Sequence, residues 1–252
     1  MRSILVGSTI LAAALLAAPV LAQDAPASDF TITGGATLTS DYRFRGISQT
    51  DKNPAIQGTI GISHSSGFYV GTWGSSIDGY VAAGSDQEID LYAGYKKTFD
   101  GTTVDGGVLY YYYPGPSGNT DFFEPYLNVS HTLGPVTGKV GLNYAWKQHA
   151  LSCGLCSNAR EDNLYTFGEL SGGIPGTGVT LTGHIGETWG RSYLSAGLKN
   201  YTDWSVTAAY TWKNLTVSVA YVDSDFKRGE AVDFSGKNVA KAGVVGAIAV
   251  AF

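Results

Sequence analysis

From residue 30 to the end of the chain, apolar and polar residues alternate with a period of two. In the first stretch Phe30, Ile32 and Leu38 share one parity, and threonines and charged residues hold the other. Successive side chains of a β-strand point to opposite faces, so this pattern predicts strands with one apolar and one polar face. About twelve such strands are expected, at residues 30–45, 54–64, 67–76, 87–99, 102–113, 121–131, 135–147, 163–173, 178–189, 201–212, 215–224 and 239–252.

The connections between these segments alternate strictly between short and long. The short ones fall at 65–66, 100–101, 133–134, 175–177 and 213–214, and the long ones at 46–53, 77–86, 114–120, 148–162, 190–200 and 225–238. Outer-membrane barrels show this asymmetry, with tight periplasmic turns and longer external loops. The fold expected is an all-β, transmembrane, antiparallel up-and-down β-barrel of about twelve strands, with both termini in the periplasm.

The distribution of aromatic and charged residues favours a membrane barrel over a soluble sandwich, whose apolar face would point inward. Charges within strands fall mostly on the polar parity, where they avoid the cost of about 2–4 kcal/mol for a cation facing lipid at the midplane. Aromatic residues gather near strand ends, as expected for the two membrane interfaces. One rim would hold Tyr42, Phe44, Tyr110–Tyr113, Trp146, Tyr201 and Tyr221, and the other Phe68, Phe99, Trp212 and Phe252.

The charged residues of the polar parity are the candidate functional residues, because in a membrane barrel they would line the lumen. They are Asp41, Arg43, Arg45, Glu88, Asp90, Lys96, Asp105, Glu124, Lys139, Glu169, His184 and Asp203. Both signs occur, so no strong ion selectivity is predicted. Asp41, Arg43 and Arg45 form the densest charge on one predicted strand face, where they would line a constriction or hold the interior through ion pairs.

The first 22 residues read as a secretory signal peptide, with Arg2 ahead of an uncharged apolar stretch. Cleavage after Ala22 would leave one outer-membrane β-barrel domain of residues 23–252; a retained membrane anchor is the alternative. Without the leader, the chain's formal charge of −5 becomes −6. This mild acidity, with no basic cluster, argues against nucleic acid as a partner.

The chain ends in Phe252, on the same parity as Val244, Ile248 and Val250. A terminal strand that closes on an aromatic residue resembles the signal that outer-membrane proteins present to their assembly machinery. The expected partners are that barrel-assembly machinery, outer-membrane lipid and lipopolysaccharide, and small hydrophilic solutes. The opposite parity of this strand holds small residues, not polar ones.

Residues 37–57 read TLTSDYRFRGISQTDKNPAIQ, and Gly67-Phe68-Tyr69 follows shortly after. These motifs resemble the opening of the TorF family of porin-like proteins from the proteobacterial outer membrane. The distinctive part covers about the first third of the chain after the leader. The resemblance implies an outer-membrane barrel and supplies no catalytic residues.

Cys153 and Cys156 form a CxxC motif in the longest connection. In an oxidising compartment a local disulfide is the favoured interpretation. A redox pair and half of a metal site are the alternatives, but no second CxxC is present and no βαβ unit is predicted. No cofactor or metal site is expected.

These features favour a narrow porin-like channel for passive diffusion of small hydrophilic solutes. The alternatives are an outer-membrane enzyme acting on lipid or peptide, an adhesion or structural barrel with a plugged lumen, and a soluble lipocalin-like binder. His184 is the one histidine expected in the middle of a strand on the polar face, and no spacing marks a nucleophile beside it. The protein is therefore not expected to be an enzyme.

Overall fold

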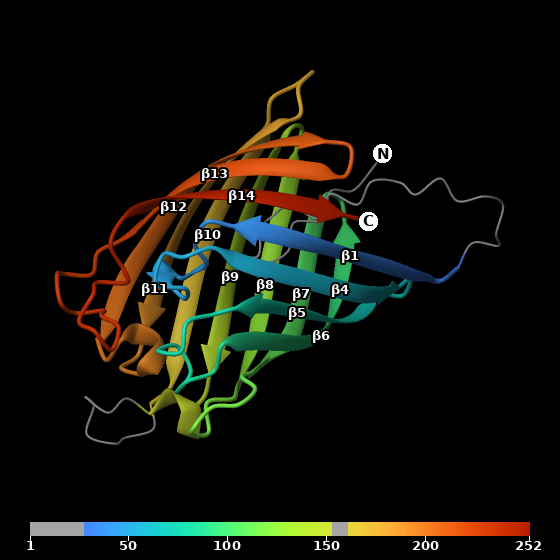
Figure 1. The fold of residues 1–252 in the computed structure, drawn as a ribbon. Helices are drawn as coiled ribbons and strands as arrows, with labels where there is room; N and C mark the ends of the chain where they lie inside the picture. Colours follow the sequence, from blue (N-terminus) through green and yellow to red (C-terminus); the bar gives the residue numbers. More distant parts are fainter. Residues whose placement is uncertain (1–27, 153–160) are drawn as a thin grey trace.

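The computed structural model describes residues 28–152 and 161–252. Twelve strands form one closed barrel, in which antiparallel neighbours follow one another along the chain (Figure 1). They are β1 (Phe30–Thr39), β4 (Ala55–His64), β5 (Phe68–Ser76), β6 (Gln87–Phe99), β7 (Thr102–Tyr112), β8 (Phe122–Leu133), β9 (Val136–Ala145), β10 (Asn163–Gly173), β11 (Val179–Trp189), β12 (Asn200–Trp212), β13 (Leu215–Ser224) and β14 (Gly243–Ala251). Pairing of β1 with β14 closes the ring. The predicted up-and-down barrel is confirmed.

The apolar parity of the strands faces outward and the polar parity faces inward. Leu38, Leu91 and Leu181 keep 53%, 50% and 48% of their surface exposed, whereas Asp90 on the opposite parity is 2% exposed. A soluble barrel would bury these leucines, because burying apolar surface drives the folding of water-soluble proteins. The wall is therefore built for contact with hydrocarbon.

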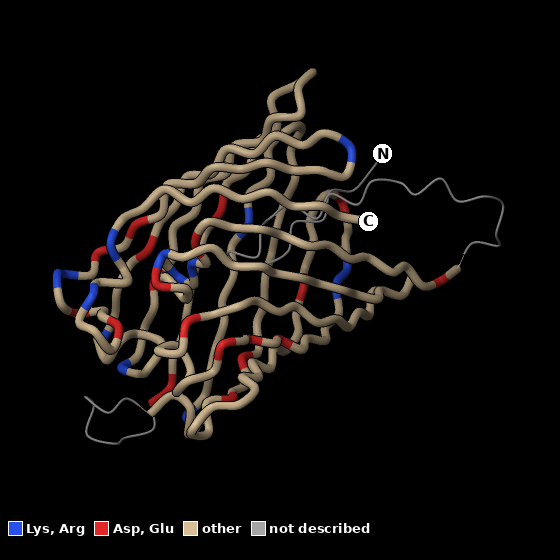
Figure 2. Tube along the Cα trace, viewed as in Figure 1, with Lys and Arg blue, Asp and Glu red and all other residues tan. Residues whose placement is uncertain are grey.

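The two ends of the barrel differ, as the connection lengths predict. Turns of a few residues join the strands at one end, where the C-terminus also lies (Figure 1). Asp100 and Gly101 form one such turn with φ of 47° and 75°, the left-handed geometry that suits a two-residue hairpin. The opposite end carries the long loops, with the short helical turns η1 (His149–Leu151) and η2 (Tyr193–Ser195), and many of the charged residues gather there (Figure 2).

Most strand boundaries lie within two residues of the predicted ones, but the first and last strands are shorter. β1 ends at Thr39 instead of residue 45, and β14 begins at Gly243 instead of residue 239. Residues 40–54, called here the inserted segment, leave the wall after β1 and turn into the barrel. They form a small hairpin of β2 (Arg43–Phe44) and β3 (Ile47–Ser48).

The aromatic rims are confirmed at the short-turn end and only in part at the long-loop end. Phe68, Phe99, Trp212 and Phe252 are all exposed at the short-turn end. At the long-loop end the exposed aromatic side chains include Tyr112, Trp146 and Tyr221. The prediction is wrong for the residues that lie on or around the inserted segment inside the barrel: Tyr42, Tyr111, Tyr113 and Tyr201, which are buried, and Phe44, which is partly buried on the hairpin.

The predicted leader, residues 1–22, lies outside the described residues. Within the part of the chain that the structure describes, no helix is long and apolar enough to cross a membrane.

Candidate functional site in the barrel lumen

The tip of the inserted segment is a two-residue turn formed by Arg45 and Gly46. Phe44 pairs with Ile47, and both turn residues are left-handed, with φ of 48° for Arg45 and 81° for Gly46. Glycine adopts this conformation freely, whereas it costs another residue about 1–2 kcal/mol. Other contacts must therefore stabilise Arg45 in place.

Those contacts come from the far side of the barrel. Arg45 Nη2 donates to both carboxylate oxygens of Glu124 on β8, at 2.7 and 2.8 Å, and Arg45 Nη1 donates to Asn163 Oδ1 on β10 at 3.2 Å. The guanidinium lies 4.3 Å from the ring centroid of Tyr165. Tyr201 Oη on β12 donates to the backbone oxygen of Arg45 at 3.1 Å. The segment that leaves β1 thus crosses the lumen to the opposite wall.

Arg45 and Glu124 form a completely enclosed ion pair. Arg45 is 2% exposed and Glu124 is 0% exposed. The Glu124 carboxylate also accepts a hydrogen bond from Tyr111 Oη and one from Asn143 Nδ2, each at 3.1 Å. A buried ion pair is tolerated when its remaining lone pairs are satisfied in this way.

The base of the inserted segment is organised by Asp41. Its carboxylate accepts hydrogen bonds from Arg43 Nε at 2.5 Å, Ser48 Oγ at 2.6 Å and Thr50 Oγ1 at 3.2 Å. The sequence predicts Arg43 and Arg45 on a strand face beside Asp41; instead both lie on the hairpin, because Asp41 folds the segment back on itself.

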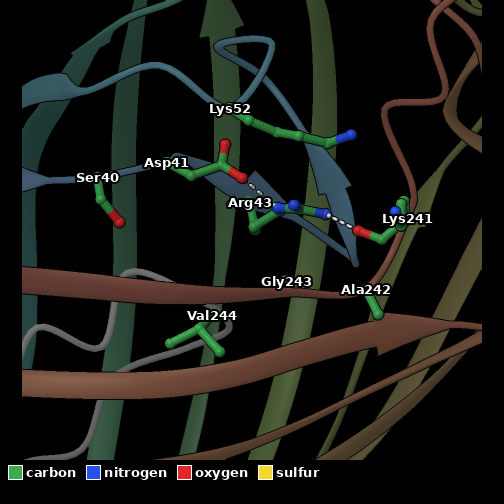
Figure 3. A pocket seen from close by; sticks show the side chains of 8 residues that line it. All are labelled: Ser40, Asp41, Arg43, Lys52, Lys241, Ala242, Gly243 and Val244. Carbon is green, nitrogen blue, oxygen red and sulfur yellow. Dashed lines mark hydrogen bonds and ion pairs between the residues drawn. The ribbon is translucent and has the colours of Figure 1, made fainter.

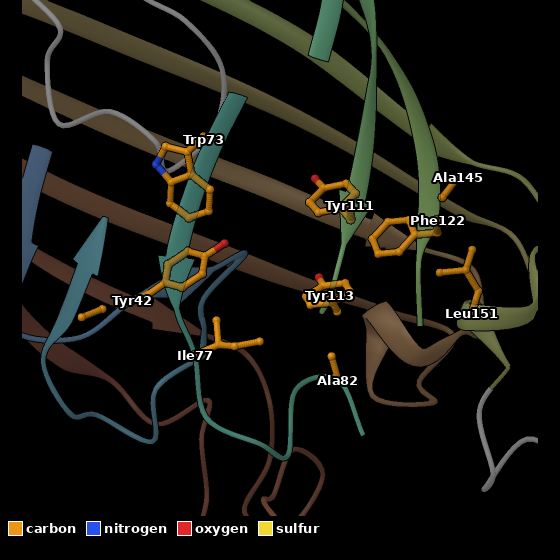
Figure 4. Close-up of a cluster of buried hydrophobic side chains, with 10 residues drawn as sticks. Tyr42, Trp73, Ile77, Ala82, Tyr111, Tyr113, Phe122, Ala145 and Leu151 are labelled. Atoms are coloured by element: carbon orange, nitrogen blue, oxygen red, sulfur yellow. The ribbon is translucent and has the colours of Figure 1, made fainter. Parts of the chain in front are cut away.

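Aromatic packing fills the space between the inserted segment and the wall (Figure 4). Tyr42 meets Trp73 edge to face at 5.3 Å, and its hydroxyl donates to Glu88 at 2.7 Å. Tyr111 stacks on Phe122 at 4.3 Å. Side chains from the long loops complete the cluster. At this level the lumen is occupied by packed side chains.

The half of the lumen nearer the short turns is lined by charged side chains on one side and by small hydroxyl side chains on the other. Lys96 and Asp105 face each other across β6 and β7, and Tyr69 Oη donates to Asp105 at 2.5 Å. Lys139 Nζ lies 3.4 Å from Glu169 across β9 and β10. The opposite wall presents small, half-buried side chains to this space: Thr33, Thr37, Thr59, Ser205, Thr207 and Ser218. This part of the lumen, called here the chamber, is lined by polar side chains, of which Lys139 and Glu169 are almost completely buried.

His184 belongs to a polar cluster on β10, β11 and β12. Its Nε2 shares a 2.8 Å hydrogen bond with Tyr165 Oη and lies 3.4 Å from Asp203 Oδ1. Tyr165 Oη also contacts both carboxylate oxygens of Asp203, at 3.1 and 3.2 Å. No serine or threonine hydroxyl of the described chain bonds this imidazole. These contacts link β10, β11 and β12 inside the barrel.

The structure places all twelve predicted lumen residues on the inner side of the barrel, in two levels. Asp41, Arg43, Arg45, Glu88, Asp90, Glu124, His184 and Asp203 surround the inserted segment or lie next to it, and Lys96, Asp105, Lys139 and Glu169 line the chamber. Three residues that contact Arg45 directly were not predicted from the sequence as site residues: Asn163, Tyr165 and Tyr201. Asn163 and Tyr165 have the same strand parity as Glu169, and Tyr201 has the same parity as Asp203. The alternation pattern could therefore have indicated that they face the lumen.

No metal centre is present within the described ranges, where no group of three or more potential ligands comes together. The CxxC motif of Cys153 and Cys156 lies outside the described residues, so the disulfide stays a prediction.

A profile of a family described as "Bacterial protein of unknown function (Gcw_chp)" matches residues 23–250. The chain belongs to the Gcw_chp family. A search of curated protein sequences found no match. The narrower resemblance to the TorF family stays a prediction.

Solved structures similar in fold to this Gcw_chp protein include outer-membrane porins and channels. The NanC porin is 14% identical with a TM-score of 0.59, and the alignment covers 88% of this chain and 99% of that one. The KdgM porin is 10% identical with a TM-score of 0.55, covering 88% and 98%. A COG4313 outer membrane channel from Pseudomonas putida F1 is 12% identical with a TM-score of 0.51, covering 91% and 99%. At these identities the likeness shows a shared porin-like fold.

Proposed function

We propose that this protein is an outer-membrane channel for small hydrophilic solutes, and that the inserted segment controls its lumen. The observation that carries the proposal is a closed twelve-strand barrel, apolar outside and polar inside. In the proposed orientation the long loops face outward and both termini lie in the periplasm. The other proposed partners are outer-membrane lipid and lipopolysaccharide, and the barrel-assembly machinery, which would read the last strand and Phe252.

The chamber favours small, neutral hydrophilic solutes. Hydroxyl groups line one side, and the charges on the other side are opposed in sign across neighbouring strands, as with Lys96 and Asp105 or Lys139 and Glu169. Such a surface exchanges hydrogen bonds with a passing solute without holding an ion of either sign strongly. Twelve strands also leave less room than the 16–18 strands of open porins.

The inserted segment gives the proposed channel a gate. It crosses the lumen, and the side chains at its tip are almost completely buried. Solute passage through this level therefore requires the segment to shift, and the Arg45–Glu124 pair is the contact that resists the shift. We expect the resting channel to conduct weakly.

Conductance in planar lipid bilayers tests the proposal. Purified, refolded wild-type protein should give small single-channel steps, and Arg45→Ala should give larger or more frequent ones. Lys227→Gln, an exposed change in a long loop, is the matched control and should behave as wild type. Folded wild-type and Arg45→Ala proteins that both fail to conduct would rule out the channel.

A structural or adhesion barrel with a plugged lumen is the second candidate, and the crossing of the lumen by the inserted segment favours it. The two functions differ in the effect of releasing the plug. A gated channel conducts once Arg45 no longer binds Glu124, whereas a barrel sealed by its whole aromatic cluster does not.

We also propose that the protein transports and does not catalyse, because among the described residues the His184 imidazole bonds Tyr165 Oη and no serine or threonine hydroxyl. Lipase and protease assays on detergent-solubilised protein test this. A turnover that disappears in His184→Ala would contradict it.

A further inference from the structure

The seam between β1 and β14 closes less completely than the other pairings of the barrel. Its register runs from Gly35 opposite Ala251 to Thr39 opposite Ala247. Beyond it, Gly34 and Phe252 exchange two backbone hydrogen bonds at the short-turn end, and Ser40 N donates to Gly246 O at 2.8 Å at the long-loop end. β14 begins at Gly243, so its first residues extend beyond the end of β1. The inserted segment has turned inward at this point and leaves the edge of β14 uncovered.

A notch of about 370 Å³ lies at this place on the long-loop end of the seam (Figure 3). Its lining comes from the inserted segment and from the start of β14: Ser40, Asp41, Arg43, Lys52, Lys241, Ala242, Gly243 and Val244. Val244 is 70% exposed and Ser40 is exposed on the same outer face as Leu38. The notch therefore borders the surface that would meet the membrane.

Arg43 lines the notch, and its guanidinium is only partly hydrogen-bonded within the protein. Its Nε donates to Asp41, and its Nη1 donates to the backbone oxygens of Gly46 and Lys241 at 3.0 Å. Its Nη2 lies against Gly243, where an added Cβ would be 3.0 Å away. Among the described residues no acceptor bonds Nη2, although Arg43 is only 3% exposed. This donor lies beside Gly243 in the lining of the notch.

Two lysines add further positive charge. Lys52 Nζ donates to the backbone oxygen of Asn238 at 2.6 Å, and Lys241 is exposed. Burial and the neighbouring charges of Arg43 and Lys237 lower the pKa of Lys52. The one carboxylate in the lining, Asp41, is already engaged by Arg43, Ser48 and Thr50. The notch holds three cations against one acid.

We propose that this notch binds a phosphate group of a membrane lipid, held by Arg43 Nη2, Lys52 and Lys241. A phosphate oxygen accepts charge-assisted hydrogen bonds from such groups, and the edge of β14 offers further backbone donors. The lipid is the source of the phosphate because the notch opens beside Val244 and Leu38, at the level where headgroups meet the apolar wall. Lipid A, with phosphates on an acylated sugar, has this chemistry.

The inference rests on the proposed outer-membrane location and not on conduction. Native mass spectrometry of the detergent-solubilised full barrel, titrated with bis-phosphorylated lipid A, tests it. Wild type should retain one lipid, and Lys52→Gln/Lys241→Gln should bind about tenfold more weakly. Lys227→Gln/Arg228→Gln removes the same charge from the same rim outside the notch and should bind as wild type. Bilayer conductance of the same preparations reports separately on the channel.

Each other outcome overturns the assignment. If the Lys227→Gln/Arg228→Gln variant bound lipid A as weakly as the Lys52→Gln/Lys241→Gln variant, the lipid would be attracted to the charge of the whole rim. If fully dephosphorylated lipid A bound as tightly as the bis-phosphorylated form, the acyl chains alone would be recognised. Inorganic phosphate that occupies the notch as tightly as lipid A would make the site one for a soluble anion. Unchanged binding in the Lys52/Lys241 variant would remove the site altogether.

Discussion

At the scale of single residues, Arg45 has more influence on the structure than any other position in the inserted segment. It adopts a left-handed backbone conformation and lies fully buried against Glu124, Asn163 and Tyr165. Removing one partner of a buried ion pair leaves the other charge without compensation, which costs about 3–5 kcal/mol. The same contact supports the hairpin tip and, in the proposed channel, holds the gate.

Arg45→Ala should therefore lower the free energy of unfolding of the refolded barrel by about 3–5 kcal/mol. Urea titration in detergent, followed by tryptophan fluorescence, measures the change. The double variant Arg45→Ala/Glu124→Ala should be less destabilised than Arg45→Ala alone, because it leaves no unpaired buried charge. Equal or greater loss in the double variant would show that the contribution is packing and not charge.

Gly46 is constrained by both its conformation and its surroundings. Gly46→Ala should destabilise the barrel by about 1–2 kcal/mol for the left-handed φ, with a further loss because the new Cβ would lie 3.0 Å from Asp203 Cβ. Gly236→Ala is a matched control, since Gly236 has φ of 83° and nothing within 4 Å of its added Cβ. Urea unfolding of both variants separates the two effects. Identical losses would show that the hairpin tip yields to the extra methyl group.

At the scale of elements, the sequence predicts nearly every strand but not the inserted segment. Alternation continues without a break from β1 through Tyr42, Arg43 and Phe44, so a longer strand is the natural interpretation. Alternation does not encode the contacts that take the chain out of the wall after β1. Asp41 folds the segment back on itself, and Arg45 binds Glu124, 79 residues away. The strands are predictable because successive residues of each strand face lipid and lumen in turn, which leaves a local alternation of apolar and polar residues in the sequence.

The inserted segment should be separable from the barrel wall. Replacing residues 43–48 with a Gly-Ser linker of equal length should keep the folded, heat-modifiable barrel and raise single-channel conductance above that of the wild type. Bilayer recordings measure this, and the same replacement at residues 115–120, which are mostly exposed in another long loop, controls for loop changes in general. Conductance unaltered by the first replacement would show that the gate lies elsewhere.

At the scale of the whole molecule, the alternation of polar and apolar residues determines the barrel fold. The side chains that occupy the lumen determine whether the proposed channel conducts. The number of strands and the sorting of loop lengths depend on patterns that run the length of the chain, and both are predictable. The occupancy of the lumen is not, because it depends on where one loop folds and on which inward tyrosines it meets. For this reason the sequence pattern places Tyr42 and Tyr201 at the outer rim, whereas the fold buries them.

The charges of the interior predict a modest preference for cations. The twelve lumen residues contain seven carboxylates and four lysines or arginines. Because Arg45, Arg43 and Lys139 each face a carboxylate, the surplus is small and negative. In a KCl gradient the reversal potential should therefore indicate higher permeability for K⁺ than for Cl⁻. Asp105→Asn, in the chamber, should shift the potential toward zero, while Asp233→Asn in a long loop should leave it unchanged. A preference for anions in the wild type would mean that Lys96 and Lys139, and not the carboxylates, set the field that a solute meets.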